Sequence, residues 1–352
     1  MTGSAIRWGI VGCGWIARDY VVPAIRASYN GELTAVCDLS AEARDWVEAP
    51  FKFERLLDMV AGDGRGQFDA LYIATPNHRH GPDATLAAQH GEGWLRGILC
   101  EKPTDLTAGG AEESAAACEA ADIRFATAFD QRWHGAHMTL REHIARGDLG
   151  AVTCIRIRYA CWTGRDWRPG DWEHDNWRVD PARAGGGAVI DLAPHGLDLS
   201  QMLTGERIED VRCLMQRSVH TDTPVDDGGV IVGRTDGGTL VDLSVAYNCP
   251  ETFPRRRLEV VGTKAMAVAI DTMGQTPGGT LTLIDATDGS SRRIDFSARD
   301  RSPFLNQIEA FSDALLGRGE WPYPPNRDVH TMRLLDDCAA DSHARATVGG
   351  VS

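Results

Sequence analysis

The stretch that decides the fold lies close to the first residue and reads Ile6-Arg7-Trp8-Gly9-Ile10-Val11-Gly12-Cys13-Gly14-Trp15-Ile16-Ala17. An apolar strand runs into a glycine turn, after which the pattern is typical of a helix. Gly12, Gly14 and Ala17 occupy the small positions of G-x-G-x-x-G/A, which allow a tight turn, close approach of a pyrophosphate and close helix packing. The helix N-terminus adds free N–H groups and partial positive charge. The stretch predicts a dinucleotide site at Gly12, Cys13, Gly14, Trp15 and Ile16.

An acidic residue follows the second apolar strand. Residues 33–37 end at Asp38, 21 positions after Ala17. A carboxylate there can accept hydrogen bonds from the adenosine ribose hydroxyls. The same charge would repel the 2′-phosphate of NADP, and no Arg or Lys stands at positions 39–41, so the sequence favours NAD. The alternative is that Asp38 caps a helix that begins near Ser40.

Length and composition restrict the class of protein. The 352 residues suggest about two domains of ~150 residues. A net charge of −14 argues against nucleic acid or an anionic membrane as a partner. The nine cysteines form no C-x-x-C pair, so we expect a reducing compartment rather than a disulfide framework. No apolar run reaches the ~18 residues that a membrane span needs. We therefore expect a cytoplasmic protein.

Strands and helices alternate over the first part of the chain. After the strand at 33–37, further strands are expected at 69–74, 97–100 and 124–129, each separated from the next by a helical segment. This alternation predicts an α/β fold with a doubly wound parallel sheet. Residues 1–130 are therefore interpreted as a Rossmann dinucleotide-binding domain. Ligands of such sheets lie beyond the carboxyl ends of the strands.

The pattern changes after about residue 130, where strands predominate. They alternate apolar and polar residues, which is typical of an antiparallel sheet with one uncovered face. We expect an α+β domain over residues 131–352 with a large, mostly antiparallel, open-faced sheet. A helix over 187–203 can cover one face, and an oligomer partner can cover the other. The expected strands lie at 152–159, 208–217, 229–234, 239–246, 257–261, 265–270, 281–284 and 292–296.

Three further motifs resemble those of a known family. They are Ala74-Thr75-Pro76-Asn77-His78, Glu101-Lys102-Pro103 and Gly185-Gly186-Gly187-Ala188-Val189-Ile190-Asp191-Leu192-Ala193-Pro194-His195. Together with the glycine turn, in this order, they resemble the Gfo/Idh/MocA oxidoreductases. The resemblance implies a cofactor cleft between the two domains, a sugar, cyclitol or related polyol as substrate, and a homodimer or homotetramer formed through the second sheet.

Three residues are the candidates for acid–base chemistry. Lys102 follows a strand at the expected cleft, where it could donate to a substrate hydroxyl, although most lysines in turns are surface residues. Asp191 and His195 lie four apart on the expected helix, so the carboxylate could fix the imidazole tautomer while the imidazole exchanges a proton. An ordinary helix pair is the alternative. The resemblance implies catalytic roles for all three and leaves open whether Lys102 or His195 moves the proton. Pro194 predicts a bend or a later helix start.

The resemblance also implies further cofactor contacts. Glu101 and Asn77 would touch the nicotinamide ribose, with Lys102 beside them, and Thr75, Pro76 and His80 would line the same loop. Trp177 and Arg178 resemble a position that closes over cofactor or substrate. For Asn77, an ordinary role as a turn residue after Pro76 is compatible with this assignment.

Tryptophans recur every five residues at Trp162, Trp167, Trp172 and Trp177, a period that fits neither helix nor strand. Aromatic rings stack on sugar C–H faces, so this loop is a candidate substrate site, and the alternative is that the rings only anchor the loop. The expected substrate contacts are Lys102, Trp162, Arg178, Asp191 and His195.

The histidines His134, His137 and His143 have no acid or cysteine in ligand spacing, and no metal is expected there. The sequence as a whole favours an NAD-dependent oxidoreductase of sugars or polyols. Two alternatives share the fold: an NAD-dependent glycosidase that oxidises its substrate transiently, and a non-catalytic dinucleotide sensor.

Overall fold

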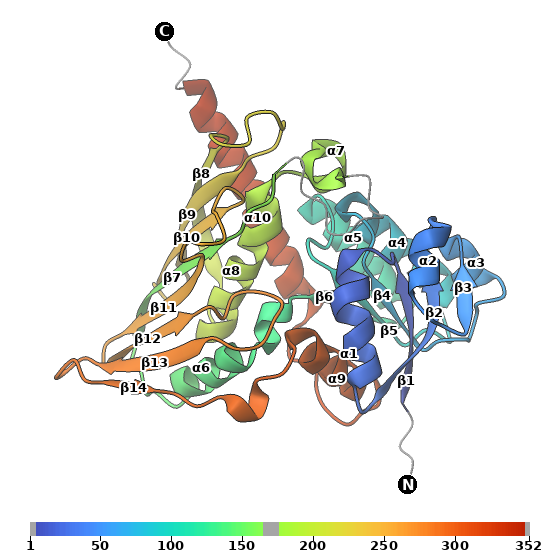
Figure 1. Cartoon of the computed structure of the whole chain (residues 1–352), viewed down its shortest axis with the longest axis horizontal. Helices are drawn as coiled ribbons and strands as arrows, with labels where there is room; N and C mark the ends of the chain where they lie inside the picture. Colours follow the sequence, from blue (N-terminus) through green and yellow to red (C-terminus); the bar gives the residue numbers. More distant parts are fainter. Residues whose placement is uncertain (1–4, 165–175, 349–352) are drawn as a thin grey trace.

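The computed structural model describes residues 5–164 and 176–348 and contains two sheets side by side (Figure 1). The first sheet is parallel, with strand order β3-β2-β1-β4-β5-β6. Its strands are short and almost fully buried at the centre, as expected for a sheet with helices on both faces. They are β1 (Ile6–Val11), β2 (Gly31–Cys37), β3 (Phe51–Phe53), β4 (Ala70–Ile73), β5 (Gly97–Glu101) and β6 (Arg124–Ala128). The expected doubly wound domain is confirmed.

Helices cover both faces of this sheet and form two separate apolar layers. The segment after the glycine turn begins as a π-helical turn, η1 (Ala17–Val21), before α1 (Val22–Ala27). The remaining helices are α2 (Ala41–Trp46), α3 (Leu56–Ala61), α4 (Asn77–Gly91) and α5 (Ala108–Ala120). Ser40, rather than Asp38, caps α2, since its side chain accepts the N–H of Ala43.

The second sheet has eight strands in the order β14-β13-β12-β11-β7-β10-β9-β8. Only β7 and β10 pair in parallel among the pairs described, so the sheet is mostly antiparallel, as predicted. The strands are β7 (Val152–Ala160), β8 (Ile208–Gln216), β9 (Gly228–Thr235), β10 (Leu240–Ala246), β11 (Arg256–Gly262), β12 (Ala265–Ile270), β13 (Thr280–Asp285) and β14 (Ser291–Arg293).

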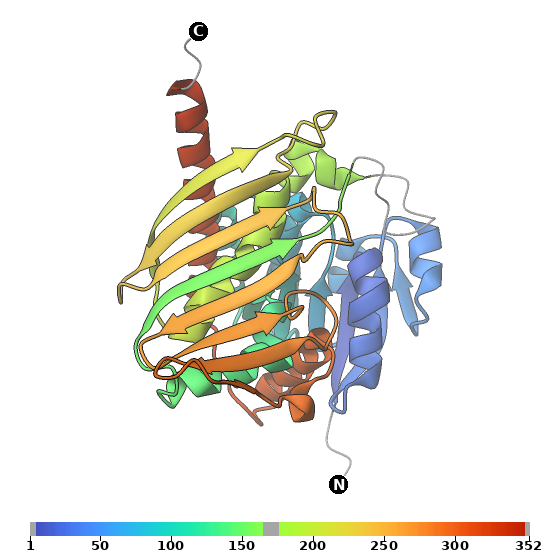
Figure 2. The ribbon, with the colours of Figure 1, turned by 60° about the vertical axis from the view of Figure 1, so that its left-hand side comes forward.

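Helices cover one face of the second sheet and leave the other open (Figure 2). The covering helices are α6 (Gly135–Ala145), α8 (Ala188–Thr204) and α10 (Pro325–Val348), and α7 (Pro181–Ala184) precedes α8. Side chains alternate between the two faces, so Ile231 is buried while Val230 and Val232 are 46% and 50% exposed. The open face therefore carries apolar side chains in the single chain.

One late helix belongs to the first domain by packing. Helix α9 (Pro303–Leu315) places Phe304, Ile308 and Phe311 in the same core as Trp8 of β1. The expected second domain, 131–352, thus includes a helix that packs on residues 1–130. Among the residues that the structure describes, no helix is long and apolar enough to span a membrane.

Candidate active site

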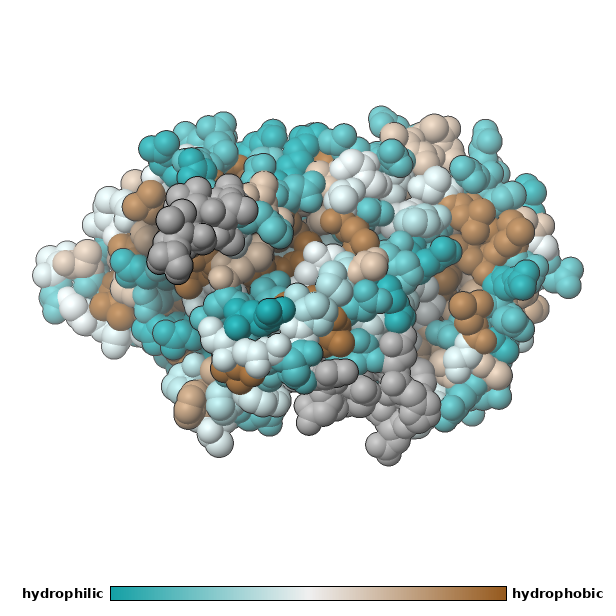
Figure 3. Space-filling view, turned by 90° about the horizontal axis from the view of Figure 1, so that it is seen from above, coloured by the Kyte–Doolittle hydropathy of each residue, from teal (hydrophilic) through white to brown (hydrophobic). Residues whose placement is uncertain are grey.

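A cavity of about 810 Å³ opens at the carboxyl ends of the parallel strands and is bounded on its other side by α8. We call it the cleft. Residues at or just beyond the carboxyl ends of the strands line it, among them Val11, Cys37, Ala74, Glu101 and Asp130. The view from above shows hydrophobic surface in a recess near the middle of this side, within a mostly hydrophilic rim (Figure 3). The position agrees with the rule that ligands of doubly wound sheets lie beyond the carboxyl ends of the strands.

The glycine turn has the geometry that its sequence predicts. Gly12 has a φ of +87°, and a Cβ there would lie 2.5 Å from the carbonyl oxygen of Ala74, so only glycine fits. A Cβ on Gly14 would meet no atom within 4 Å, because that position faces the open cleft. Trp15 and Ile16 line the cleft beside Gly14, whereas Cys13 contributes its backbone N–H to Asp38.

Asp38 stands at the end of β2 and fastens the glycine turn. Its Oδ2 accepts the N–H of Cys13 at 2.7 Å, and its Oδ1 accepts the N–H of Ser40 at 2.8 Å. Both carboxylate oxygens are thereby oriented, and the residue lines the cleft. The negative charge is held at the place where an adenosine ribose lies in this class of fold.

Lys102 and Asp191 meet across the cleft. The Lys102 Nζ lies 2.5 Å from Asp191 Oδ1 and also donates to the Asp191 carbonyl oxygen at 2.9 Å. Burial by itself would raise the pKa of Asp191, but the charge and hydrogen bond of Lys102 outweigh it and lower that pKa to about 2. The carboxylate is therefore ionised and holds the ammonium group at the mouth of the cleft.

His195 lies one turn further along α8 and is 4% exposed. The expectation that Asp191 would hold its imidazole is not matched by the contacts: Asp191 is paired with Lys102, and the carboxylate beside His195 is Asp130, with Oδ1 3.3 Å from Nδ1. Burial, together with the charge of Lys102, lowers the pKa of His195 to about 3. The imidazole is therefore neutral at rest.

The position of α8 depends on a contact that the sequence analysis did not identify. Asp226 accepts the N–H groups of Gly187 and Val189 at 2.7 and 2.8 Å, which satisfies the free donors at the helix N-terminus. A Cβ on Gly187 would lie 1.9 Å from the Asp226 carbonyl oxygen, so the helix approaches this closely only with glycine there. Pro194 lies inside α8, which begins at Ala188, so the predicted later start is wrong.

The loop after β4 and the end of β5 line the cleft as expected. Asn77 donates to the carbonyl oxygen of Ala184 at 2.9 Å and so ties α4 to α7. Glu101 accepts the Tyr72 hydroxyl at 2.7 Å, and burial raises its pKa. His80 has the carbonyl oxygens of Thr75 and Pro103 at 2.6 Å from its two ring nitrogens. The cleft-lining residues of this group are Thr75, Pro76, Asn77, His80, Glu101 and Lys102.

The first and last tryptophans of the predicted loop, Trp162 and Trp177, lie in different surroundings. Trp177 and Arg178 line the cleft, and the Arg178 guanidinium lies over the Trp177 ring at 4.5 Å. Trp162 is not among the described residues that line the cleft; its ring contacts His220 with centroids 4.8 Å apart. Trp167 and Trp172 lie outside the described residues.

The histidines after β6 have structural contacts. His137 lies within 2.8 Å of the Gln131 carbonyl oxygen and 3.0 Å of the Thr272 hydroxyl, and its ring lies 5.0 Å from that of His134, tilted by 39°. His143 pairs with Asp148. No group of three or more potential metal ligands occurs within residues 5–164 and 176–348.

Several cleft-lining residues were not assigned from the sequence, and two of them, Asp130 and Tyr159, lie beside His195. Asp130 lies two residues after β6 ends at Ala128, so a search of the residues just beyond each strand end would have found it. Tyr159 lies on β7 of the second sheet, and no local pattern connects it with the first domain.

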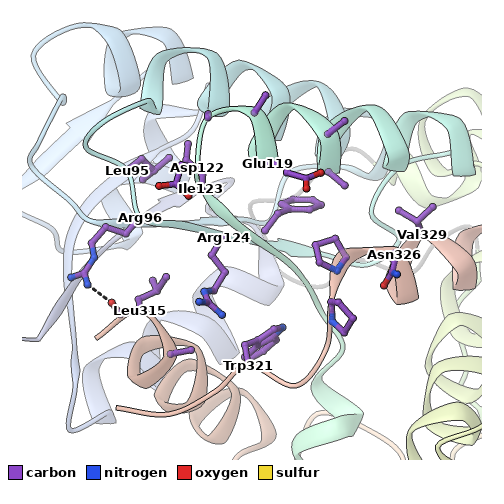
Figure 4. Close-up of a pocket in the computed structure, with 18 of the residues that line it drawn as sticks. Leu95, Arg96, Glu119, Asp122, Ile123, Arg124, Leu315, Trp321, Asn326 and Val329 are labelled. Atoms are coloured by element: carbon purple, nitrogen blue, oxygen red, sulfur yellow. Dashed lines mark hydrogen bonds between the residues drawn. The ribbon is translucent and has the colours of Figure 1, made fainter. Parts of the chain in front are cut away.

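A larger hollow of about 1250 Å³ lies at the amino ends of β5 and β6 (Figure 4). Its wall includes Arg96 and Arg124, which stand before and at the start of those strands, and Trp321 from the segment before α10. Arg96 donates to the carbonyl oxygen of Leu315. None of the glycine turn, Lys102 or His195 lines this hollow.

The chain matches two models of one family. Residues 6–129 match the oxidoreductase family with a NAD-binding Rossmann fold, and residues 137–268 match the Gfo/Idh/MocA C-terminal domain. The chain therefore belongs to the Gfo/Idh/MocA family of oxidoreductases, and its first domain is an NAD-binding Rossmann domain. This is the family that the motifs predicted.

Individual relatives align with this chain over nearly its full length. The chain is 27% identical to the 1,5-anhydro-D-fructose reductase of Ensifer adhaerens, over 89% of both chains. It is 26% identical to the inositol 2-dehydrogenase of Rhizobium meliloti, over 96% of this chain and 97% of the other. The aldose–aldose oxidoreductase of Caulobacter crescentus has the same fold, with a TM-score of 0.83 at 20% identity over 97% and 98% of the two chains.

Proposed function

We propose that this oxidoreductase transfers hydride between NAD and a secondary carbinol or ketone of a sugar, cyclitol or related polyol. The observation that carries the proposal is convergence: Lys102, Asp191 and His195 line the same cavity as Gly12 and Asp38. The relatives support the substrate class, since they are named for anhydrofructose and inositol.

The residues at the carboxyl edge fit a dinucleotide. The open space over Gly14 is what a pyrophosphate needs, and the N-terminal turn of a helix favours an anion there. Asp38 is placed for the ribose hydroxyls, and Asn77 and Glu101 for the second ribose. Bound NAD supplies or accepts the hydride, and the protein supplies orientation and proton transfer.

His195 and Lys102 form the proposed acid–base pair. The neutral imidazole can take the proton of a carbinol, while the Lys102 ammonium, held by Asp191, donates a hydrogen bond to the same oxygen. Arg178 borders the cleft next to them and is our candidate for contact with further hydroxyls. Trp162 stays a prediction as a substrate contact.

The preference for NAD over NADP rests on the charge of Asp38. Asp38→Asn keeps an oxygen that can accept the Cys13 N–H but removes the charge that repels a 2′-phosphate. We expect the ratio of kcat/KM for NADP to that for NAD to rise by roughly 10-fold. An unchanged ratio would assign the discrimination to other residues.

The first experiment is to follow NADH formation over a panel of aldoses, inositols, aminosugars and uronic acids, with NAD and with NADP. Lys102→Ala and His195→Ala proteins run beside the wild type. We expect turnover of at least one substrate by the wild type and its loss in both variants. Full turnover in both variants would rule out this site.

The rival functions give different results in the same assay. An NAD-dependent glycosidase would cleave aryl glycosides only with NAD and would release no NADH. A sensor would bind NADH and turn over nothing. Either result would replace the dehydrogenase proposal.

We also propose that the open face of the second sheet joins copies of the chain into a homodimer or homotetramer. Leu214 of β8 pairs across the strands with Val230, and both are exposed in the single chain together with Val232 and Leu240. Apolar side chains on a sheet face are typical of an interface between subunits. Val230→Glu with Val232→Glu should lower the sedimentation mass, and Val219→Glu, outside the strands, should not.

We further propose that the protein works in the cytoplasm. All nine cysteines are free thiols. Free thiols persist in a reducing compartment.

A further inference from the structure

Asp130 is a buried acid in the cleft to which the proposed function assigns no role. It directly follows Phe129 at the end of β6, is 3% exposed and lines the same cavity as Lys102. Its Oδ1 lies 3.3 Å from Nδ1 of His195. Among the described residues, Nδ1 has no partner with good hydrogen-bond geometry, so the Asp130 carboxylate is the polar group beside an otherwise unsatisfied atom.

The second oxygen of Asp130 is fixed by the next residue. Gln131 Nε2 donates to Asp130 Oδ2 at 2.9 Å. The orientation of the Gln131 amide is set by Gly274, whose N–H donates to Oε1 at 3.1 Å and whose carbonyl oxygen accepts from Nε2 at 2.9 Å. Gln131 can therefore present only N–H to Asp130, and the carboxylate is held with Oδ1 toward His195.

The imidazole is confined on its flanks. The rings of Phe129 and Tyr159 meet it edge-on, with centroids at 6.3 and 5.6 Å. Asp191, the carboxylate that shares the helix with His195, is engaged with Lys102. Asp130 is thus left as the acid that can select the tautomer of His195.

We propose that Asp130 is a positioning residue for His195: it accepts the Nδ1–H and so leaves the Nε2 lone pair free for the proton of the substrate carbinol. This inference rests on the proposed function. In oxidation the carbinol O–H bond breaks and an Nε2–H bond forms, while the carbon loses hydride to the cofactor. The resulting imidazolium lies against the carboxylate of Asp130, which stabilises it. Reduction of the ketone is the reverse.

Whether Nε2 of His195 can accept the carbinol proton then depends on the protonation state of Asp130, and so on pH. Burial, with the charge of Glu101, raises the pKa of Asp130 to about 7. Above that pH the carboxylate accepts Nδ1–H and Nε2 is a base. Below it the carboxyl donates to Nδ1, Nε2 carries the proton, and oxidation slows. The charged or titratable groups around the pair, from every element that packs on it, are Tyr20, Tyr72, Glu101, Lys102, Tyr159, Asp191 and Asp198.

Asp130→Asn tests the proposal with an isosteric change. Because Gln131 offers only N–H, the new amide turns its oxygen to Gln131 and its N–H to Nδ1 of His195. That locks His195 as the Nε2–H tautomer, which cannot accept the carbinol proton. We expect kcat for oxidation to fall by about 10³–10⁴-fold, as for the matching Asp→Asn change in serine proteases. KM and NADH affinity should stay within about 2-fold, since the variant keeps the cleft's shape.

The control is Asp227→Asn, which also exchanges a buried carboxylate for an amide. Asp227 holds the N–H groups of Ser218, Val219 and His220 and does not line the cleft. Its kcat and pH profile should match those of the wild type. The rise in oxidation rate through pH about 7 should be present in the control and absent in Asp130→Asn. An Asp130→Asn enzyme that keeps its rate and its pH profile would overturn the proposal.

A second measurement does not depend on substrate. In ¹⁵N-histidine-labelled protein, the His195 resonances, assigned by their loss in His195→Gln, report the tautomer directly. We expect Nδ1–H in the wild type above pH about 7 and Nε2–H in Asp130→Asn. An Nε2–H tautomer in the wild type above that pH would refute the inference. If the wild type turns over nothing, the proposed function fails while this spectrum still decides the role of Asp130.

Discussion

The cleft and the hollow lie at opposite ends of the same parallel strands and differ in what their walls offer. The hollow is the larger, at about 1250 Å³ against about 810 Å³. Its charged groups are bound at the surface, as in the exposed pair of Arg333 and Glu112. In the cleft, Lys102, Asp130 and His195 converge from three different elements and are largely buried.

The larger volume of the hollow is therefore not accompanied by the convergent, buried polar groups that the cleft has. Buried polar groups that converge on one space cost free energy unless they are paired, and such costs are tolerated where the groups have a function. The carboxyl ends of the strands bring these groups together because the chain passes through that edge after every parallel strand.

The largest effect on kcat is expected from replacing one cationic side chain in each region by methionine. Lys102→Met removes the charge that faces Asp191 and the proposed donor to the substrate oxygen, so kcat should fall by about 10³-fold. Arg124→Met, in the wall of the hollow (Figure 4), should change kcat by less than about 2-fold. Equal losses of kcat in the two variants would mean that the hollow matters to the reaction as much as the cleft.

The second effect is expected at Arg132, which lies close to residues of both the cleft and the hollow. Arg132 is two residues from Asp130 of the cleft, and its guanidinium lies 4.1 Å over the ring of Tyr323, which lines the hollow. It is fully buried and paired with Asp198 and Asp328. Arg132→Met leaves Asp328 without its cation and leaves Asp198 with Arg327 as its remaining cation, so the free energy of unfolding in urea should fall by about 3 kcal/mol.

The control for that prediction neutralises the two carboxylates that pair with Arg132. Asp198→Asn and Asp328→Asn in the Arg132→Met background should recover part of the lost stability. If the free energy of unfolding does not recover, the loss in Arg132→Met comes from packing and not from charge.

Acid should weaken the support of the cleft in particular. Burial lowers the pKa of His134 to about 4 and, with the charge of His134, that of His137 to about 3. Both lie below the unfolded value of about 6.5, so the unfolded state binds more protons as the pH falls below 6.5. The free energy of unfolding should drop by about 1.4 kcal/mol per pH unit for each histidine until about pH 4.

Urea titrations across this range measure that slope. His137→Gln should reduce it by about 1.4 kcal/mol per pH unit. Hydrogen exchange should show the segment around Gln131, whose carbonyl oxygen contacts His137, opening before the hollow, whose lining contains no histidine among the described residues. An identical slope in the variant would contradict the assignment.

The smallest effect is expected at the rim of the hollow. Arg333 and Glu112 form an ion pair with about half of each side chain exposed. Exposed pairs contribute little, so Arg333→Ala should change the free energy of unfolding by less than about 0.5 kcal/mol, with no effect on rate. A loss of activity in this variant would point to a function for the hollow.

Much of the fold and of the site could be predicted from local sequence. The glycine turn, Asp38 and Lys102 are defined by their places at the ends of apolar strands, and the Rossmann arrangement makes those ends neighbours. Trp162 shows the limit, because a periodic tryptophan pattern does not say which ring faces the cleft. Helix α9 shows another, since its apolar face does not name the domain on which it packs.

Spacing along single strands, turns and helices was enough to predict a parallel sheet followed by a mostly antiparallel one, and a dinucleotide turn, and to name Lys102, Asp191 and His195 as candidates for acid–base chemistry. Which carboxylate lies beside which candidate base follows from the tertiary structure alone. Asp191 and His195 share a helix face, yet Asp191 meets Lys102 from β5, and His195 meets Asp130 from the end of β6. Such pairings depend on the distance between separate elements, and packing sets that distance.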